Sequence, residues 1–582
     1  MSPTLPFSKP RTLADHSADY RMLLLAAAAL IVGTGAAMGA WLLLKSIAVA
    51  TNLFWFGRLS AASAEIIDNG LGFALVLIPV AGSLIIGLMA RFGSDKIRGH
   101  GIPEAIEAIL YGESRLSPKV ALLKPLSSAI SIGSGGPFGA EGPIIMTGGA
   151  IGSLFAQCFH LSAAERKTLL VAGAAAGMTA IFGTPVAAIL LAIEILLFEW
   201  KPRSFVPVVV AVLVSLAWRP LLIGSGALFP FAAATPPGAA PIAWAMGVGA
   251  LVGIEAAVLS GLLYRVEDIF HRLPVHWMWW PAIGAIGVGI GGLIDARVLG
   301  AGYQSIQALL DGSLALRSML ALLFVKAAVW LIALGSGTSG GVLAPLLIMG
   351  GALGVLLGQY LPGAAGFWCM IGMAGIISGA MRAPLTGAVF AVELTGHFDA
   401  LPETIAASAG AYAISVLLMR RSILTEKIAR RGRHILQEYS VDALDFLQAG
   451  QVMTRDPVCL PGIATLRDTV AFFAREAEHR SYPVVDAENH LLGLVSRSDA
   501  LKWQSSPDQG NTLLQDVLSD ASQPHGSVAS PIGAIADLMI ETGIGRIPII
   551  DPATAEVVGI LTRHDLLRAR RMTAKAETKR GR

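Results

Sequence analysis

Long apolar segments, separated by short charged or Gly/Pro-rich breaks, run through the first 420 residues of the chain. The first uncharged run covers 22–44 and is ended by Lys45, and the second covers 71–90. Each is long enough to cross a bilayer as a helix, which takes roughly 20 residues. Further apolar segments lie at about 168–198, 205–223, 240–263, 277–294, 318–334, 342–360, 366–380, 384–395 and 403–419. The pattern predicts a polytopic α-helical membrane protein in which several segments are too short for a straight span.

The stretch 133–152, GSGGPFGAEGPIIMTGGAIG, lies within this apolar region. It contains eight glycines, two prolines and one ionisable side chain, Glu141. Non-helical backbone persists at membrane depth only where protein buries it or water reaches it. Glycines let backbone amides approach a ligand closely, and helix N-termini carry partial positive charge. We therefore predict a broken helix aimed at an anion, with Glu141 beside it.

An internal repeat supports this prediction. The Gly, Ser and Pro pattern of 133–152 recurs 202 residues later, at 335–354, and 173–194 matches 372–393 at an offset of 199. The membrane part, 21–420, is therefore expected to form two related halves, about 21–224 and 240–420. Glu194 and Glu393 match each other, which favours a structural role, such as bonding the backbone of broken helices, over a place on a proton path.

The composition becomes less apolar after residue 420. Residues 421–448 are basic and are expected to form a linker, and 449–571 reads as a soluble α/β region with its own repeat. The polar segment 1–20 is not a secretory signal and is expected in the cytoplasm. The basic tail, 572–582, is expected to be disordered.

The overall composition excludes several classes of protein. The chain is 54% hydrophobic and 14% charged, with a mean hydropathy of +0.65, which places it in a bilayer. The net charge of +3 gives no argument for nucleic-acid binding. Cys158, Cys369 and Cys459 are far apart, so neither a disulfide framework nor a metal site is predicted. An enzyme is disfavoured because no Walker, zincin or nucleophile-elbow motif occurs.

Four ordered motifs resemble those of the CLC family of chloride channels and chloride/proton antiporters, followed by a CBS-domain pair. GHGIP at 99–103 is similar to the family's GSGIP, GAEGP at 139–143 to GREGP, and GVLAP at 341–345 to GxFxP, and RAPLTGAVFAVELTG at 382–396 resembles a segment of the second half. The resemblance covers about residues 20–570. It implies a CLC-type inverted repeat of tilted and broken helices in the cell (inner) membrane, a cytoplasmic α/β CBS pair, and a homodimer with one anion pathway in each subunit.

The resemblance also implies functional residues by matching motif positions. Glu141 would be the gate and proton carrier: ionised it occupies the outer anion site, and protonated it swings away. The implied anion-binding residues are His100, Gly101, Ile102, Gly139, Ala140, Val342, Leu343 and Leu424. In the CBS pair, Ser496, Asp499, Thr562 and Asp565 stand where a nucleotide ribose is often held. An adenine nucleotide is thus a candidate ligand, an empty structural pair is an equal alternative, and no cofactor is required.

Three positions depart from the family pattern. His100 replaces the serine of GSGIP, Leu424 stands where a tyrosine usually faces the anion, and Ile195 stands where many antiporters have an inner proton-transfer glutamate. Two hydroxyl donors are therefore missing, and the imidazole N–H could replace one of them. The first hypothesis is exchange of chloride or a similar small anion for protons. The alternatives are a passive, voltage- or pH-gated chloride channel regulated by the CBS domains, and a membrane-anchored nucleotide sensor.

Overall fold

The computed structural model describes residues 20–66, 71–232, 236, 238–433, 447–505, 510–518 and 523–569. Residues 1–19 of the expected N-terminal segment, 434–446 of the expected linker and the whole expected tail, 572–582, lie outside the described residues. The chain divides into two compact units, Met1–Gln437 and Glu438–Arg582. Each unit has hydrophobic core clusters of its own.

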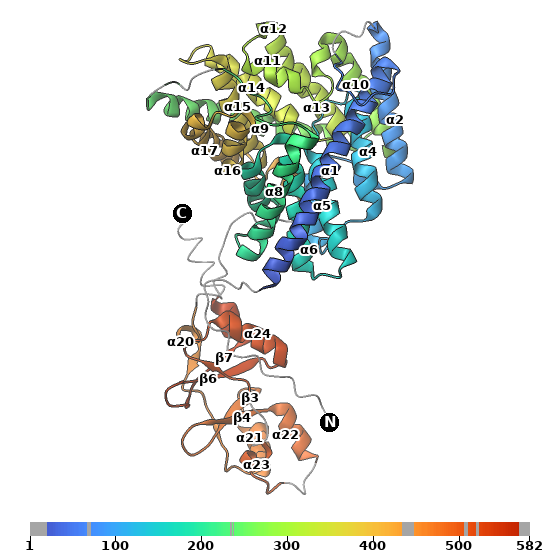
Figure 1. Ribbon diagram of the computed structural model, residues 1–582. Coiled ribbons are helices and arrows are strands. Elements are labelled where there is room, and N and C mark those ends of the chain that lie inside the picture. The colour runs from blue at the N-terminus through green and yellow to red at the C-terminus, as the bar shows by residue number, and fades with distance from the viewer. Residues whose placement is uncertain are drawn as a thin grey trace. The chain divides into compact units, whose positions relative to one another are not determined.

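The first unit is a bundle of α-helices (Figure 1). Its first half contains α1 (Arg21–Phe56), α2 (Leu77–Phe92), α3 (Ile102–Tyr111), α4 (Pro118–Gly133), α5 (Glu141–Cys158), α6 (Ala163–Phe182), α7 (Pro185–Leu191) and α8 (Pro202–Leu222). Its second half contains α9 (Ala240–His271), α10 (Trp280–Ile294), α11 (Tyr303–Leu310), α12 (Leu316–Leu320), α13 (Lys326–Gly335), α14 (Leu343–Gly358), α15 (Ala365–Met381), α16 (Pro384–Thr395) and α17 (Leu401–Leu418). A last helix, α18 (Ile423–Arg430), follows both halves.

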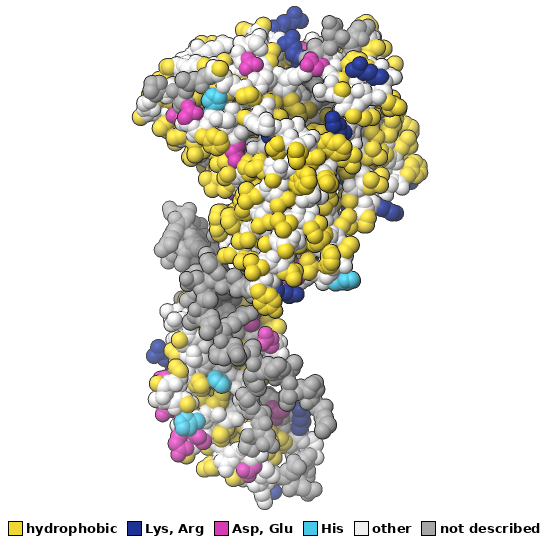
Figure 2. Space-filling view, viewed as in Figure 1, with side chains coloured by type: hydrophobic (Ala, Val, Ile, Leu, Met, Phe, Trp, Pro, Cys, Tyr) yellow, Lys and Arg dark blue, Asp and Glu magenta, His cyan; other side chains and the backbone are white. Residues whose placement is uncertain are grey.

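The surface of this unit suits a bilayer. Hydrophobic side chains cover most of the face seen in Figure 2, and charged side chains gather toward its two ends. Seven helical segments in the described part of the chain are long and apolar enough to cross a membrane: 21–56, 72–92, 202–222, 240–271, 277–294, 316–335 and 398–430. Shorter apolar helices include α14, α15 and α16. The prediction of a polytopic helical membrane protein is confirmed.

The first helix extends beyond the first uncharged run. That run ends at Lys45, and α1 continues to Phe56. Lysine is a good helix former, and its long stem lets the ammonium group reach a polar partner while the backbone stays helical. Lys45 is exposed, and its Nζ lies 3.5 Å from the Ala61 carbonyl oxygen.

The two halves are broken at equivalent places. α4 ends at Gly133 and α5 begins at Glu141, while α13 ends at Gly335 and α14 begins at Leu343. Only 134–140 of the first Gly-rich stretch is non-helical, because its later glycines lie inside α5. Those glycines let α5 and α6 pack closely: a Cβ on Gly148 would lie 2.1 Å from the carbonyl oxygen of Gly173.

Two carboxylates join the halves reciprocally. Glu393 accepts hydrogen bonds from the Val186 and Ala187 amides at 3.0 and 2.8 Å, at the start of α7. Glu194 accepts hydrogen bonds from the amide and hydroxyl of Thr386 at 2.8 and 2.6 Å, at the start of α16. Each carboxylate thus satisfies N–H groups that have no partner within their own helix. The structure shows the backbone-bonding role that the repeat favoured for both residues.

The second unit contains two sheets, with strand orders β1-β7-β6-β5 and β2-β3-β4. The strands are β1 (Thr454–Arg455), β2 (Leu460–Pro461), β3 (Ser481–Val485), β4 (Leu491–Ser496), β5 (Gly526–Ser527), β6 (Arg546–Ile550) and β7 (Val557–Thr562). The helices are α20 (Ala449–Val452), α21 (Leu466–Arg475), α22 (Arg497–Gln504), α23 (Leu514–Leu518) and α24 (Ile532–Thr542). In each sheet a parallel strand pair adjoins an antiparallel hairpin, β2-β3-β4 in one and β5-β6-β7 in the other. This equivalence confirms the predicted α/β repeat.

Candidate anion site at two broken helices

Glu141 begins α5 and lies against the start of α14. Its Oε1 accepts a hydrogen bond from the Ala344 N–H at 2.9 Å, and the residue is only 1% exposed. Its Oε2 has no hydrogen-bond partner in the described part of the chain. The first amides of a helix have no intrahelical acceptor, and the helix dipole adds partial positive charge there. The start of α14 therefore favours an anion, and in this structure a carboxyl oxygen of Glu141 occupies that position.

Two glycines make room for the carboxylate. Gly139 and Gly341 pair in an antiparallel bridge, in which the Gly341 N–H donates to the Gly139 carbonyl at 3.1 Å. A Cβ on Gly139 would lie 1.9 Å from Glu141 Oε2, and a Cβ on Gly341 would lie 2.7 Å from Oε1. The breaks in the two halves thus face each other and enclose a single carboxylate.

The GHGIP motif is the third segment that reaches this point. A Cβ on Gly142 would lie 2.0 Å from the His100 carbonyl oxygen and 3.2 Å from the Gly341 Cα, so the three segments touch. Gly101 has a φ of 90°, which a side chain would disfavour, and this conformation precedes the start of α3. The Gly101 N–H donates to Glu104 Oε2 at 3.0 Å, which fixes the turn.

The His100 side chain lacks a partner. The residue is 2% exposed, and neither ring nitrogen has a hydrogen-bond partner among the described residues. The charged groups that act on its ring are those of Lys427, Glu104, Lys124 and Arg431. A buried polar group without a partner is costly unless a ligand or water satisfies it. Two of these basic groups, Lys427 and Arg431, are paired with Glu104, and Arg431 is also paired with Glu107.

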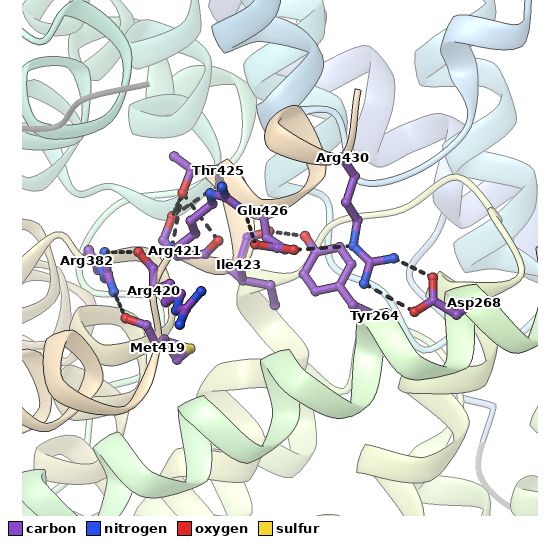
Figure 3. Close-up of polar contacts among 11 residues, drawn as sticks. Tyr264, Asp268, Arg382, Met419, Arg420, Arg421, Ile423, Thr425, Glu426 and Arg430 are labelled. Carbon is purple, nitrogen blue, oxygen red and sulfur yellow. Dashed lines mark hydrogen bonds and ion pairs between the residues drawn. The ribbon is translucent and has the colours of Figure 1, made fainter. Parts of the chain in front are cut away.

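Helix α18 carries Leu424 and is held at both ends by α9. Leu424 is fully buried. In Figure 3, the Tyr264 hydroxyl points at the Ile423 carbonyl and donates a hydrogen bond to it at the start of α18. At the other end, Arg430 binds the Asp268 carboxylate at 2.5 and 3.3 Å. Both contacts come from the last turns of α9, so α9 fixes the position of α18.

Ion pairs also join α18 and the residues after it to α3. Glu104 binds Lys427 at 3.4 Å and Arg431 at 3.1 Å. Glu107 binds Arg431 at 2.6 Å and Arg433 at 2.5 Å. Because the same Glu104 caps the start of α3, these ion pairs connect the GHGIP turn with the basic end of α18.

The structure thus brings most of the predicted site residues together. The segments that meet at the Glu141 carboxylate contain His100, Gly101, Ile102, Gly139, Ala140, Val342 and Leu343. Leu424 lies on α18, whose described link to these segments runs through Lys427 and Glu104. Ile195 is buried in the π-helical segment Ala192–Leu197 and offers no titratable group.

A pair of buried lysines was missed by the sequence analysis. Lys124 donates to the Gly99 carbonyl at 2.6 Å, and Lys326 donates to the Gly300 carbonyl at 2.9 Å. Each ammonium group also binds the carbonyl two residues earlier, at 2.8 Å. The two lysines are separated by the repeat offset of 202 residues, and this spacing is the signal that could have revealed them.

The four predicted nucleotide-site residues form two equivalent helix caps. Asp499 Oδ2 accepts hydrogen bonds from the Ser496 amide and hydroxyl at 3.0 and 2.6 Å. Asp565 Oδ2 accepts the same bonds from Thr562 at 2.9 and 2.6 Å. In the described part of the chain, Oδ1 of Asp565 makes no hydrogen bond, and Oδ1 of Asp499 lies 3.8 Å from Lys502. One oxygen of each carboxylate thus caps the start of the following helix.

One acidic group in this unit resembles a metal site. Asp486, Glu488 and His490 bring one ligand atom each within 4.8 Å of one another. Asp486 Oδ1 accepts the amides of Glu488 and His490 at 3.0 and 2.7 Å, as in a local turn. Desolvation acts to raise the pKa of Asp486, but the hydrogen bonds from His490 and Glu488 keep it below its usual value. These contacts account for the cluster, and we assign no metal to it.

The fold defines a helical membrane protein of two repeated halves, whose broken helices meet at the Glu141 carboxylate. Residues 81–416 match the family model described as voltage gated chloride channel, and residues 449–506 and 527–571 match that of the CBS domain. Because the first match covers more than half of the chain, the protein belongs to the voltage gated chloride channel (CLC) family. It also carries a C-terminal CBS pair.

This chain is similar both to relatives named exchange transporters and to relatives named chloride channels. It is 30% identical over 383 residues to the H(+)/Cl(-) exchange transporter ClcA of Salmonella paratyphi A, a match that covers 61% of this chain and 80% of the relative. It is 30% identical over 368 residues to the voltage-gated ClC-type chloride channel ClcB of Escherichia coli O81 (strain ED1a), covering 61% and 87%. A putative chloride channel protein, ClcB-like, of Ralstonia nicotianae is 27% identical over 369 residues, covering 62% and 86%.

Solved structures show the same fold. A eukaryotic CLC transporter superposes with a TM-score of 0.59 at 20% identity and covers 94% of this chain and 98% of its own. A slow cyanobacterial Cl-/H+ antiporter has a TM-score of 0.61 at 20% identity, covering 71% and 99%. A CLC-type fluoride/proton antiporter has a TM-score of 0.60 at 19% identity, covering 69% and 97%. The CLC-type architecture predicted from the sequence is confirmed.

Proposed function

We propose that the protein exchanges chloride, or a similar small anion, for protons across the cell (inner) membrane, with Glu141 as gate and proton carrier. The observation that carries the proposal is the place of the Glu141 carboxylate, with Oε1 2.9 Å from the Ala344 N–H at the start of α14. Ionised, the carboxylate fills a position that an anion could occupy. Protonated, it loses most of its attraction to the amides, so an anion can replace it. Competition for one position links proton uptake to anion entry.

The remaining site residues would form the rest of the pathway. The proposed anion contacts are those of His100, Gly101, Ile102, Gly139, Ala140, Val342, Leu343 and Leu424, of which only His100 offers a polar side chain. The unpartnered ring of His100, beside three basic groups, supports an inner anion position there. We assign the end of the pathway at the GHGIP motif to the cytoplasm. Arg91, Lys96 and Arg98 precede this motif, and basic flanks mark the cytoplasmic side of a membrane protein.

The second unit is proposed as a cytoplasmic regulator. We assign the membrane part to 21–420, the linker to 421–448 and the CBS pair to 449–571, in a protein that forms homodimers. An adenine nucleotide would bind through the carboxylate oxygens of Asp499 and Asp565 that the helix caps leave over, beside Ser496 and Thr562. A nucleotide is not required for transport in this proposal.

A passive chloride channel is the second candidate. The observation in its favour is Ile195, an apolar buried residue where an inner proton-transfer glutamate was expected. The names of the relatives include both exchange transporter and channel, so they do not separate the two functions.

Flux from reconstituted protein separates these functions. A chloride gradient across sealed liposomes should drive protons uphill if the protein is an exchanger, and chloride alone should move if it is a channel. Glu141→Ala should stop the proton movement while chloride continues to flow. Glu199→Gln is the control, because the partners of the Glu199 carboxylate are Lys167, Lys201 and Ser204, none of which is a proposed site residue. Absence of uphill proton movement in the unmodified protein would overturn the exchange proposal.

A further inference from the structure

Tyr303 lies next to the gate but was not singled out by the sequence. It is the first residue of α11, and its hydroxyl accepts a hydrogen bond from the Ala140 N–H at 3.5 Å, immediately before Glu141. Its ring packs against Phe182 and Phe229, at centroid distances of 6.5 and 5.9 Å. The ring packing and the hydrogen bond together hold the hydroxyl in place.

The hydroxyl group can still donate. In the described part of the chain, Tyr303 makes one side-chain hydrogen bond, in which its oxygen is the acceptor. Its O–H proton therefore has no acceptor there, and the residue itself is only half-buried. Two adjoining cavities of about 420 and 310 Å³ are lined by Tyr303, and the larger one also by Ala140 and Lys45. A donor without an acceptor thus borders open space beside the gate.

The repeat relates this place to the proposed inner anion position. Gly300 and Gly302 before α11 match Gly99 and Gly101 before α3, and all four have a positive φ. Buried Lys326 donates to the Gly300 carbonyl just as buried Lys124 donates to the Gly99 carbonyl. His100 approaches the start of α5 at Gly142, whereas Tyr303 approaches it at Ala140. The two glycine-bounded helix starts therefore reach two nearby residues at the start of α5, and each carries a polar side chain without a full set of partners.

We propose that the Tyr303 hydroxyl donates a hydrogen bond to a small monovalent anion at the outer end of the pathway, beside the Ala140 amide, once Glu141 has left the start of α14. This inference rests on the proposed function, because the position exists only when the carboxylate moves. It gives the outer end a hydroxyl donor, whereas the inner end lacks the two that Leu424 and His100 replace. Tyr303 is thereby a determinant of anion affinity and not a carrier of protons.

Chloride binding to detergent-solubilised protein tests the proposal by isothermal titration calorimetry. The comparison is made in the Glu141→Ala background, where the carboxylate cannot compete. Adding Tyr303→Phe should weaken chloride binding about tenfold, the size expected for one hydrogen bond to a charged group. Tyr360→Phe, at an 86% exposed tyrosine, is the control and should leave the affinity unchanged. Equal chloride affinity with and without the Tyr303 hydroxyl overturns the proposal.

The test distinguishes this proposal from the proposed function. If Glu141→Ala binds no chloride, the carboxylate and the anion do not compete, and both proposals fail. If it binds chloride with an affinity independent of Tyr303, only the Tyr303 proposal fails. A second readout covers loss of folding in Tyr303→Phe: chloride titration of Glu141→Ala should shift the ultraviolet absorption of a tyrosine, and a flat titration contradicts the proposal.

Discussion

Glu393→Ala is predicted to destabilise the protein without changing its proton coupling. The Glu393 carboxylate accepts two amide hydrogen bonds, at 3.0 and 2.8 Å, from the start of α7, and the residue is only 7% exposed. Alanine would leave both amides without an acceptor and remove a negative charge from a helix start. A hydrogen bond to a charged group contributes about 1.5–3 kcal/mol, and a charge at a helix terminus about 0.3–1 kcal/mol.

Together these contributions predict a loss of about 3–7 kcal/mol in the free energy of unfolding. For a unit of this size, Met1–Gln437, that loss corresponds to a fall of about 4–8 °C in Tm. The Tm of Glu194→Ala should fall by less than that of Glu393→Ala, because Glu194 is only partly buried. Glu199→Ala serves as the control, since its ion pairs with Lys167 and Lys201 are partly exposed and such pairs contribute about 1 kcal/mol at most.

Thermal unfolding of the detergent-solubilised protein, followed by size-exclusion chromatography, measures this loss. The same variants, reconstituted and assayed well below Tm, should keep the proton-to-anion ratio of the unmodified protein. A Glu393→Ala protein with an unchanged Tm and a lost proton coupling would refute the reasoning. That result would mean that Glu393 takes part in proton transfer and does not stabilise the fold.

Three further substitutions test the site and the CBS pair. Gly139→Ala should displace the Glu141 carboxylate, because the added Cβ would lie 1.9 Å from Oε2. In a liposome flux assay, proton coupling should fall while chloride still moves, and unchanged coupling would contradict the geometry. His100→Ser should change the ranking of chloride, nitrate and fluoride fluxes or their dependence on pH; identical fluxes at pH 5 and 8 in both proteins would rule out a contact of the His100 ring with the anion. Asp565→Asn should weaken adenosine nucleotide binding, measured by calorimetry, by about tenfold, since the amide replaces a charged acceptor; equal binding would rule out this carboxylate as a ribose ligand.

Clusters of Gly and Pro made the broken helices predictable. Closely spaced Gly and Pro favour a break in an apolar run, so the breaks before α5 and α14 could be predicted from 133–152 and its repeat at 335–354. The extent of the first break could not, because the later glycines of 133–152 stay helical. Glu141 stood out because an acidic side chain at membrane depth needs a compensating partner. The family motifs then placed these features in order along the chain, and the structure shows the same order.

Contacts between distant segments were not predictable in the same way. The partner of Glu141 is the Ala344 amide, which carries no side-chain signal and lies 203 residues away. Lys124 and Lys326 bind backbone carbonyls, so no acidic residue marks either of them in the sequence. Tyr303 looks like an ordinary aromatic residue at the start of a short helix, and only its distance from Ala140 relates it to the gate.

The central claim is that the Glu141 carboxylate and the transported anion compete for the amides at the start of α14. A crystal structure of Glu141→Gln grown in bromide, with the anomalous signal of the ion, tests it most directly. The account predicts a bromide within hydrogen-bond distance of the Ala344 N–H, where the carboxylate oxygen lies in the unmodified protein. Bromide bound elsewhere on the pathway, with none at the start of α14, would contradict the account.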